Sequence, residues 1–499
     1  MKFNTSHFTL YRVSLPLTLL IAIAGIVAPE ALAEGGQAIT ATVFEALDWF
    51  FLVSVTTFLL LALWIAFSRW GSLRLGPPDA PPDFAFASWI SMLFSAGIGS
   101  GLLFWGVAEP VTHFAHPPVG LAGTPEAARQ ALLITNFHWG FHAWGVYGMA
   151  ALVLAWFGHR KGQKYLAGSP LRAAFSGRWV GPVAWIADLV SVLAVTFGVA
   201  GALVLGVRQL QAGLGITSGL PADMSTSMVL LLLTTVAFLI SATTSLDKGI
   251  KWLSNFNIAL ALGLMIFLLM AGPTDFLLRG FANSLGDYLS ALPSLTLRLY
   301  PFEAIGDWVR GWTVTYFVWW IAWAPFVGIF IARISRGRTI REFVLGVVVT
   351  PSVLSVLWFA IFGGTGLFEE TMGDGEIVRL VDANVTSALF NVFDRLPGAQ
   401  VLSGVAVVLI FVFLITSADS ATFVLGMITS DGSFDPPARR KLLWGLTLSA
   451  ISAALMLTGS IRTVQTLSIL GAIPFTFIML LQVAALLRSL RAEPMEGDE

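Results

Sequence analysis

Long apolar runs separated by short polar segments dominate the hydrophobic pattern of this 499-residue chain. A helix that crosses a bilayer needs about 20 mostly apolar residues. Twelve runs qualify, at about residues 13–30, 45–68, 86–107, 129–157, 181–213, 227–246, 251–271, 312–332, 343–364, 398–427, 441–459 and 463–488. The pattern therefore predicts an all-α polytopic membrane protein with about twelve transmembrane helices.

Composition agrees with a membrane protein and excludes several other classes. Only 11% of the residues are charged, whereas soluble domains average about 25%. The net charge of −1 leaves no basic surface for nucleic acid, and the lack of cysteine excludes disulfides and thiolate chemistry. The first apolar run precedes Ala31-Leu32-Ala33, as in a signal peptide. It is also long enough to reach across most of a bilayer, and an uncleaved helix is favoured because it makes the distribution of basic residues consistent.

The distribution of basic residues predicts the orientation of the chain. With the N-terminus in the cytoplasm, 20 Lys and Arg residues fall on the inner side and 7 on the outer side. This asymmetry is the one expected of a multi-pass protein. We therefore expect a protein of the cell inner (cytoplasmic) membrane with both termini in the cytoplasm.

Two interruptions of the apolar pattern suggest internal symmetry. AGIGSG (96–101) lies within the third expected span and Trp323-Ala324-Pro325 within the eighth. Carriers built from inverted repeats have broken helices at corresponding positions, although a glycine cluster alone is also typical of close helix packing. The expected divisions are an N-terminal segment with spans 1–2, a first five-helix repeat, a periplasmic amphipathic helix, a second five-helix repeat and a short acidic tail, at residues 1–80, 81–271, 272–311, 312–490 and 491–499.

Six aromatic residues near the middle of two spans are at the wrong depth for an interfacial belt. They lie in HWGFHAWGVY and WWIAWAPF, and are Trp139, Trp144, Tyr147, Trp319, Trp320 and Trp323. Such a group either fills space between helices or forms a cage for a ligand cation, with quaternary ammonium as the usual guest. Successive helical residues are 100° apart, so the three tryptophans of the second segment cannot all face one ligand.

WWIAWAPFVGIFIARISRGRTIREF resembles the signature of the betaine/choline/carnitine transporters, and the resemblance extends from Val13 to Arg488. It implies a leucine-transporter-like fold of two inverted repeats (spans 3–7 and 8–12) with broken helices 3 and 8, usually in a homotrimer. It implies a substrate box of Trp139, Trp144, Tyr147 and Trp320. Trp323 would border this box, and Trp319 and Phe326 would line the path below it.

The same resemblance implies a site for Na⁺ as the coupling ion. Its ligands would be the hydroxyls of Thr416 and Ser417 with the carbonyls of Ser95, Ile98 and Phe413, although helical Ser and Thr often bond their own backbone. A second sodium site, at Thr196 and Phe326, is doubtful because valines occupy the other expected threonine positions. No other cofactor is expected.

The expected function is import of a quaternary-ammonium or related compatible solute by alternating access. Glycine betaine is preferred over choline because Gly101 stands where choline-transporting members often have aspartate. Ser100 and Ile98 join the expected substrate-binding residues. The alternatives are an Na⁺-independent or H⁺-coupled carrier of choline, carnitine or a sulfonium solute, and a ligand sensor without transport.

An enzyme is not expected, and no catalytic residue is assigned. The six histidines include no HExxH pattern. His138 and His142 are four apart, a spacing that suits a metal on one helix face, but the sequence indicates no third ligand.

Overall fold

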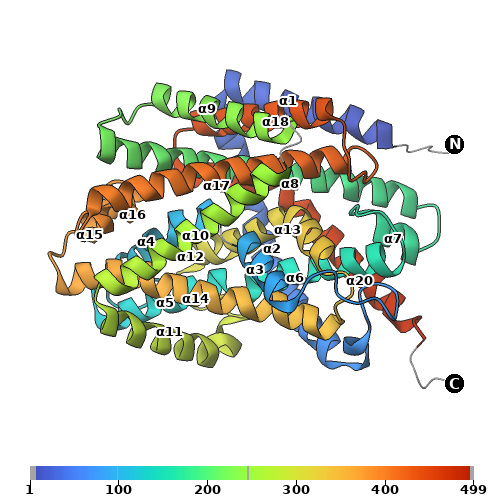
Figure 1. Cartoon of the computed structure of the whole chain (residues 1–499), viewed down its shortest axis with the longest axis horizontal. Helices are drawn as coiled ribbons and strands as arrows, with labels where there is room; N and C mark the ends of the chain where they lie inside the picture. The colour runs from blue at the N-terminus through green and yellow to red at the C-terminus, as the bar shows by residue number, and fades with distance from the viewer. Residues whose placement is uncertain (1–6, 98, 244–246, 495–499) are drawn as a thin grey trace.

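The computed structural model describes residues 7–97, 99–243 and 247–494, and this part of the chain is helical without a β-sheet. Figure 1 shows the elements as one bundle. The helices are α1 (His7–Val27), α2 (Pro29–Phe67), α3 (Phe86–Gly97), α4 (Ser100–Ala115), α5 (Pro125–Trp139), α6 (Phe141–Ala155), α7 (Ser169–Ala174), α8 (Val180–Ser218), α9 (Met224–Thr243), α10 (Asp247–Ala271), α11 (Thr274–Leu295), α12 (Gly306–Val309), α13 (Thr315–Ile334), α14 (Ile340–Met372), α15 (Ile377–Ala383), α16 (Ala388–Phe393), α17 (Ala399–Ile428), α18 (Ala438–Leu457), α19 (Ile461–Ile469) and α20 (Ile473–Arg491).

Ten helices of the described residues are long and apolar enough to cross a membrane, or eleven if a bent pair counts as one span. The bent pair is α10 and α11, whose axes differ by 114°. The expected span at 86–107 does not enter this count because it is divided into two short helices, α3 and α4. The all-α polytopic class predicted from the apolar runs is confirmed.

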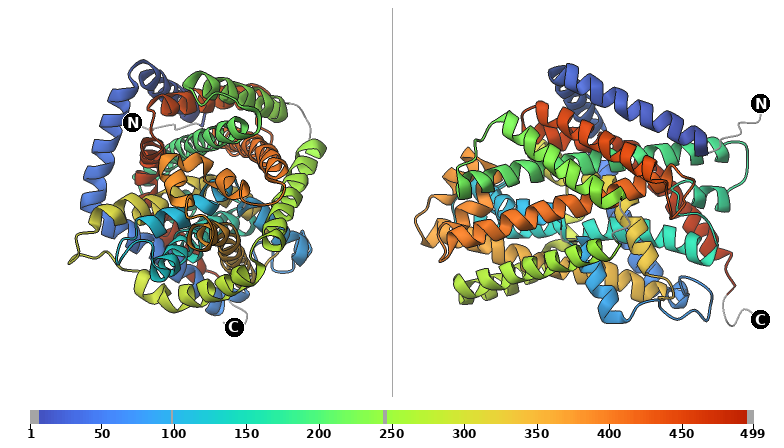
Figure 2. Two further views of the ribbon diagram at one scale, coloured as in Figure 1. Left: turned by 90° about the vertical axis from the view of Figure 1, so that its left-hand side faces the viewer. Right: turned by 45° about the horizontal axis from the view of Figure 1, so that its top comes forward.

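The bundle has a packed centre and peripheral helices on opposite sides. The central helix α13 packs on α6, α17 packs on α8, and α1 packs on α18. In Figure 1, α1, α9 and α18 lie along one side and α11 lies along the other. Figure 2 shows α1 as an outer helix against the rest of the bundle.

The two ends of the bundle differ. The start of α1, the end of α20 and α7 lie at one end, and α15 and α16 lie at the other (Figure 1). At the α7 end, Glu493 accepts hydrogen bonds from Arg160 and Lys161. These contacts attach the chain just after α20 to the end of the helix that follows α6.

The break expected in the third span is present. Helix α3 ends at Gly97 and α4 begins at Ser100, and Gly99 between them has an extended backbone (φ −135°, ψ −180°). Side chains of α8 and α14 bind the start of α4, because Gln209 and Trp358 donate hydrogen bonds to the carbonyls of Leu103 and Leu102. Gly99 is half-buried, and these two bonds hold the first turn of α4 against α8 and α14.

The break expected at Trp323-Ala324-Pro325 is wrong. Helix α13 continues from Thr315 to Ile334 with Pro325 inside it. Proline removes one backbone donor and crowds the preceding turn. Most of α13 around Pro325 is nevertheless buried, with Trp323 and Phe326 half-buried, and this packing keeps the segment helical. The irregular part of the span is instead a π-helical turn at Arg310–Val314.

A break that we did not expect divides the fourth span at Gly140, between α5 and α6. The freed N–H of Phe141 donates to the Tyr288 hydroxyl at 2.8 Å, and the two rings stack with centroids 5.3 Å apart. A Cβ at position 140 would lie 2.5 Å from that hydroxyl, so the position requires glycine. Tyr288 belongs to α11, the expected amphipathic helix, which thereby contacts the middle of the bundle.

Candidate functional site

All four residues of the predicted box contact one another in series near the breaks at Gly99 and Gly140. The Trp139 and Trp320 ring centroids are 4.9 Å apart, and Tyr147 lies 5.9 Å from Trp320 and 5.6 Å from Trp144. Each pair is edge to face, and all four side chains are buried. Trp139 is the last residue of α5, Trp144 and Tyr147 follow on α6, and Trp320 comes from the continuous helix α13.

The other aromatic candidates on α13 fall on two sides of Trp320. Trp319 lies parallel to Trp320 with centroids 6.2 Å apart, and it also contacts Tyr316. Trp323 and Phe326 are half-buried and contact each other at 5.7 Å. Trp319 is therefore on the Tyr316 side of the cluster, separate from the Trp323–Phe326 pair.

The start of α4 lies directly against the box. A Cβ built on Gly101 would be 3.2 Å from the edge of the Trp139 ring. Ser100, the first residue of α4, is buried, and no side chain caps the helix. Of the remaining candidates here, Ile98 is outside the described residues, and nothing is described of the Ser95 side chain.

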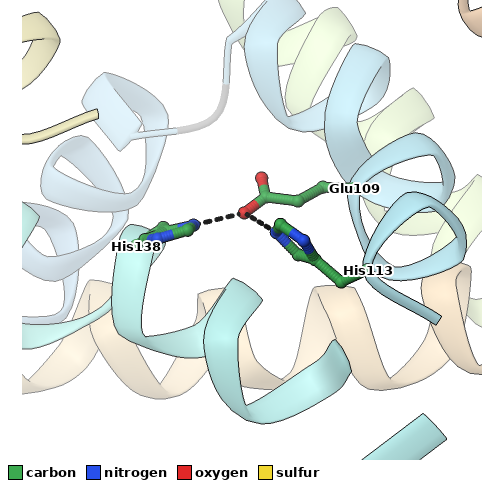
Figure 3. Close-up of side chains that lie close together, drawn as sticks. All are labelled: Glu109, His113 and His138. Atoms are coloured by element: carbon green, nitrogen blue, oxygen red, sulfur yellow. Dashed lines mark hydrogen bonds and ion pairs between the residues drawn. The ribbon is translucent and has the colours of Figure 1, made fainter. Parts of the chain in front are cut away.

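A buried carboxylate, that of Glu109, binds Trp139 of the box and the neighbouring Tyr316. Glu109 Oε2 accepts hydrogen bonds from Trp139 Nε1 at 2.7 Å and from the Tyr316 hydroxyl at 2.5 Å. Its other oxygen, Oε1, lies 2.7 Å from His138 Nδ1 and 3.4 Å from His113 Nε2 (Figure 3). One side chain of α4 thus fixes a ring on α5 and a ring on α13.

His138 extends this network to the next residues. Its Nε2 lies 3.0 Å from the Thr313 hydroxyl, and its backbone carbonyl accepts a hydrogen bond from Trp320 Nε1 at 2.8 Å. His142 is separated from His138 by the break at Gly140 and stacks on Phe317. The group of metal-ligating side chains that contains His138 in the described residues includes Glu109 and His113 but not His142.

Our sequence reasoning missed Glu109, His113 and Tyr316. A signal was available for the first two, because EPVTH places an acid and a histidine four residues apart on one helix face. Their meeting with His138 needed the tertiary structure.

A profile of the betaine/carnitine/choline family of transporters matches residues 9–495. The chain belongs to this family. The betaine/carnitine/choline family members are transporters, so the protein is a membrane transporter and not an enzyme.

Named relatives of the betaine/carnitine/choline family cover nearly the whole chain. The glycine betaine transporter OpuD of Bacillus subtilis is 42% identical over 490 residues, which are 98% of this chain and 95% of that protein. The ectoine/hydroxyectoine transporter of Virgibacillus pantothenticus is 40% identical, over 100% of this chain and 99% of its own length. The high-affinity choline transport protein of Escherichia coli is 36% identical, over 90% of this chain and 67% of its own length.

The sodium ligands implied by the family resemblance lie mainly on α17. Thr416 Oγ1 donates to the Val412 carbonyl at 3.0 Å, and Thr416 and Ser417 are both half-buried. Phe413 is buried one turn earlier on the same helix. The other half of the site falls on Ser95 and Ile98, so the assignment stays a prediction.

The doubtful second sodium site gains no support from the side-chain geometry. Thr196 is buried on α8 and its hydroxyl donates to the Val192 carbonyl at 2.7 Å. Phe326 contacts Trp323. A hydroxyl that bonds its own helix is the usual arrangement for a buried threonine.

Proposed function

We propose that this chain imports a zwitterionic compatible solute, with glycine betaine as the first candidate, by Na⁺-coupled symport. The observation that carries the proposal is the set of four contacting rings beside Gly101. A quaternary ammonium has no N–H to donate, so aromatic faces are its natural partners in a dry site. The relatives named for glycine betaine and ectoine support a solute of this class.

The preference for a zwitterion over a bare cation rests on where carboxylates lie. Gly101 places no acid on the box side of Trp139, and a buried cation without a counter-charge is costly. Glu109 is close, but its Oε2 binds Trp139 and Tyr316 and its Oε1 is directed at His138 and His113, so neither oxygen is directed at a solute among the rings. The carboxylate of a zwitterion would instead meet the start of α4, where N–H groups attract anions.

Coupling to sodium is proposed from α17. Thr416 and Ser417 offer two adjacent hydroxyl oxygens, and a hard cation requires oxygen ligands. We further propose a homotrimer in the inner membrane with both termini in the cytoplasm, where the basic loops would lie.

Choline is the second candidate solute, because the Escherichia coli choline transport protein is a relative at 36% identity. Uptake into proteoliposomes separates the candidates. We expect labelled glycine betaine to accumulate only with an inward Na⁺ gradient, and choline to compete weakly. Equal uptake without Na⁺ would contradict the coupling, and choline that competes as well as betaine would contradict the zwitterion preference.

A further inference from the structure

Glu109, His113 and His138 direct metal-ligating atoms toward one point beside the aromatic box. Figure 3 shows the two residues of α4 facing the histidine of α5. One ligand atom from each residue lies within 4.8 Å of the other two, and all three side chains are buried. In the described part of the chain this is the one such group of three.

His113 has an unexplained environment. It is 1% exposed, and neither ring nitrogen makes a hydrogen bond within the described residues. Its Nε2 lies 3.4 Å from Glu109 Oε1, and its ring packs against Trp312 with centroids 4.5 Å apart. Buried polar groups normally have partners, but Nδ1 of His113 has none in the described residues, and Nε2 has only this 3.4 Å contact with the carboxylate.

Two of the three residues, Glu109 and His138, have outer contacts typical of metal ligands. Trp139 and Tyr316 bind Oε2 of Glu109, which leaves Oε1 directed at the two imidazoles. The far nitrogen of His138 lies 3.0 Å from the Thr313 hydroxyl. Metal-binding histidines commonly donate their second N–H to such a group, and metal-binding carboxylates are commonly hydrogen-bonded.

We propose that Glu109, His113 and His138 bind a divalent transition-metal ion such as Zn²⁺. The ligand atoms are Oε1 of Glu109, Nε2 of His113 and Nδ1 of His138. Zinc bonds of about 2.0–2.2 Å place neighbouring ligand atoms roughly 3.3 Å apart, and the two contacts of Oε1 are 2.7 and 3.4 Å. Any proton on a ligating nitrogen leaves when the ion binds, and a water completes the tetrahedron.

The ligand chemistry selects the class of ion. Two imidazoles and one carboxylate suit Zn²⁺ or Co²⁺, whereas Mg²⁺ and Ca²⁺ prefer sets made of oxygen. An ion here would bridge α4 and α5 one residue before Trp139. If the proposed transport function holds, we expect Zn²⁺ to slow uptake by restricting these two helices, but the binding test does not depend on transport.

Metal binding to the purified protein tests the proposal. The full chain, prepared with a tag that contains no histidine and stripped by chelator, is equilibrated with Zn²⁺ or Co²⁺ and dialysed. We expect one equivalent of Zn²⁺ by elemental analysis, and a Co²⁺ visible spectrum of four-coordinate intensity that Zn²⁺ abolishes. His113→Gln and Glu109→Gln should each weaken binding at least 100-fold.

Two further histidines provide matched controls. His142 is also buried with both ring nitrogens unpartnered in the described chain, but it stacks on Phe317 outside the cluster, so His142→Gln should keep full binding. His116 forms an exposed pair with Asp382, and His116→Gln should also keep it.

Thermal unfolding distinguishes a metal bound at the cluster from a metal bound elsewhere on the protein. A Zn²⁺-dependent rise in melting temperature in the unmutated protein and His142→Gln, absent in His113→Gln, would support the site. If His113→Gln does not fold, Glu109→Gln carries the same comparison. No retained equivalent in the unmutated protein, retention by both cluster variants, or loss only in His116→Gln would overturn the proposal.

Discussion

Replacing Trp320 by alanine should weaken solute binding at least about 30-fold. The centroid of the Trp320 ring lies 4.9 Å from that of Trp139 and 5.9 Å from that of Tyr147, so removing the ring opens one wall of the box. A cation–π contact is worth about 2 kcal/mol when desolvated, and each 1.4 kcal/mol is a factor of ten in Kd. Calorimetric titration of the purified protein with glycine betaine measures the change.

Two comparison variants separate loss of the wall from loss of folding. Trp320→Phe loses the hydrogen bond to the His138 carbonyl. It keeps an aromatic face, so it should bind glycine betaine more tightly than the alanine variant does. Trp444→Ala removes a fully buried tryptophan from α18, which packs on α1 and α9, and should lower the melting temperature with little change in Kd. Betaine affinity in Trp320→Ala within twofold of the unmutated protein would refute the box.

Three further predictions address coupling, selectivity and pH. Thr416→Ala with Ser417→Ala should abolish Na⁺ activation of uptake, because two oxygen ligands are lost where water cannot replace them; unchanged Na⁺ activation in proteoliposomes would place the site elsewhere. Gly101→Asp should shift competition toward choline, and Gly101→Ala, which adds bulk 3.2 Å from Trp139 without charge, should weaken both solutes; equal shifts in the two variants would refute the role of charge. Burial opposes ionisation of Glu493, but hydrogen bonds from Lys161 and Arg160 outweigh it and hold the pKa of Glu493 below 4.5. The stability that the ionised Glu493 contributes is present above pH 4.5 and is lost as the pH falls through the lowered pKa. The melting temperature of Glu493→Gln should therefore fall less between pH 6 and 3 than that of the unmutated protein.

The class of the fold followed from the sequence because the bilayer imposes a length and a composition on every span. Breaks in the helices were harder to predict. Glycine at position 99 was recognised within a glycine cluster, but the single Gly140 had no such neighbours, and its role depends on Tyr288 from a distant helix. Pro325 is a strong local signal, and packing along α13 overrides it.

The aromatic candidates could be named from their depth in the spans, and the structure brings four of them together. The network behind them could not be derived, because it joins positions far apart in the chain. Glu109 and Tyr316 are separated by 207 residues, and no periodicity relates α4 to α13. Helical spacing alone paired His138 with His142, and the break at Gly140 invalidated that geometry.

The walls of the box differ in how firmly the fold holds them. Trp320 lies within α13, an unbroken helix in the packed centre of the bundle. Trp139 and Gly101 each lie within two residues of a break, at Gly140 and Gly99. A small rotation at either break would therefore move Gly101 or Trp139 relative to the Trp320 ring. Such a motion would change the Glu109–Trp139 hydrogen bond most directly, because this bond joins the two broken spans. The carboxylate thus couples the shape of the box to the relative position of α4 and α5, and this is why a change at Glu109 should alter solute affinity even though its side chain lies behind the rings.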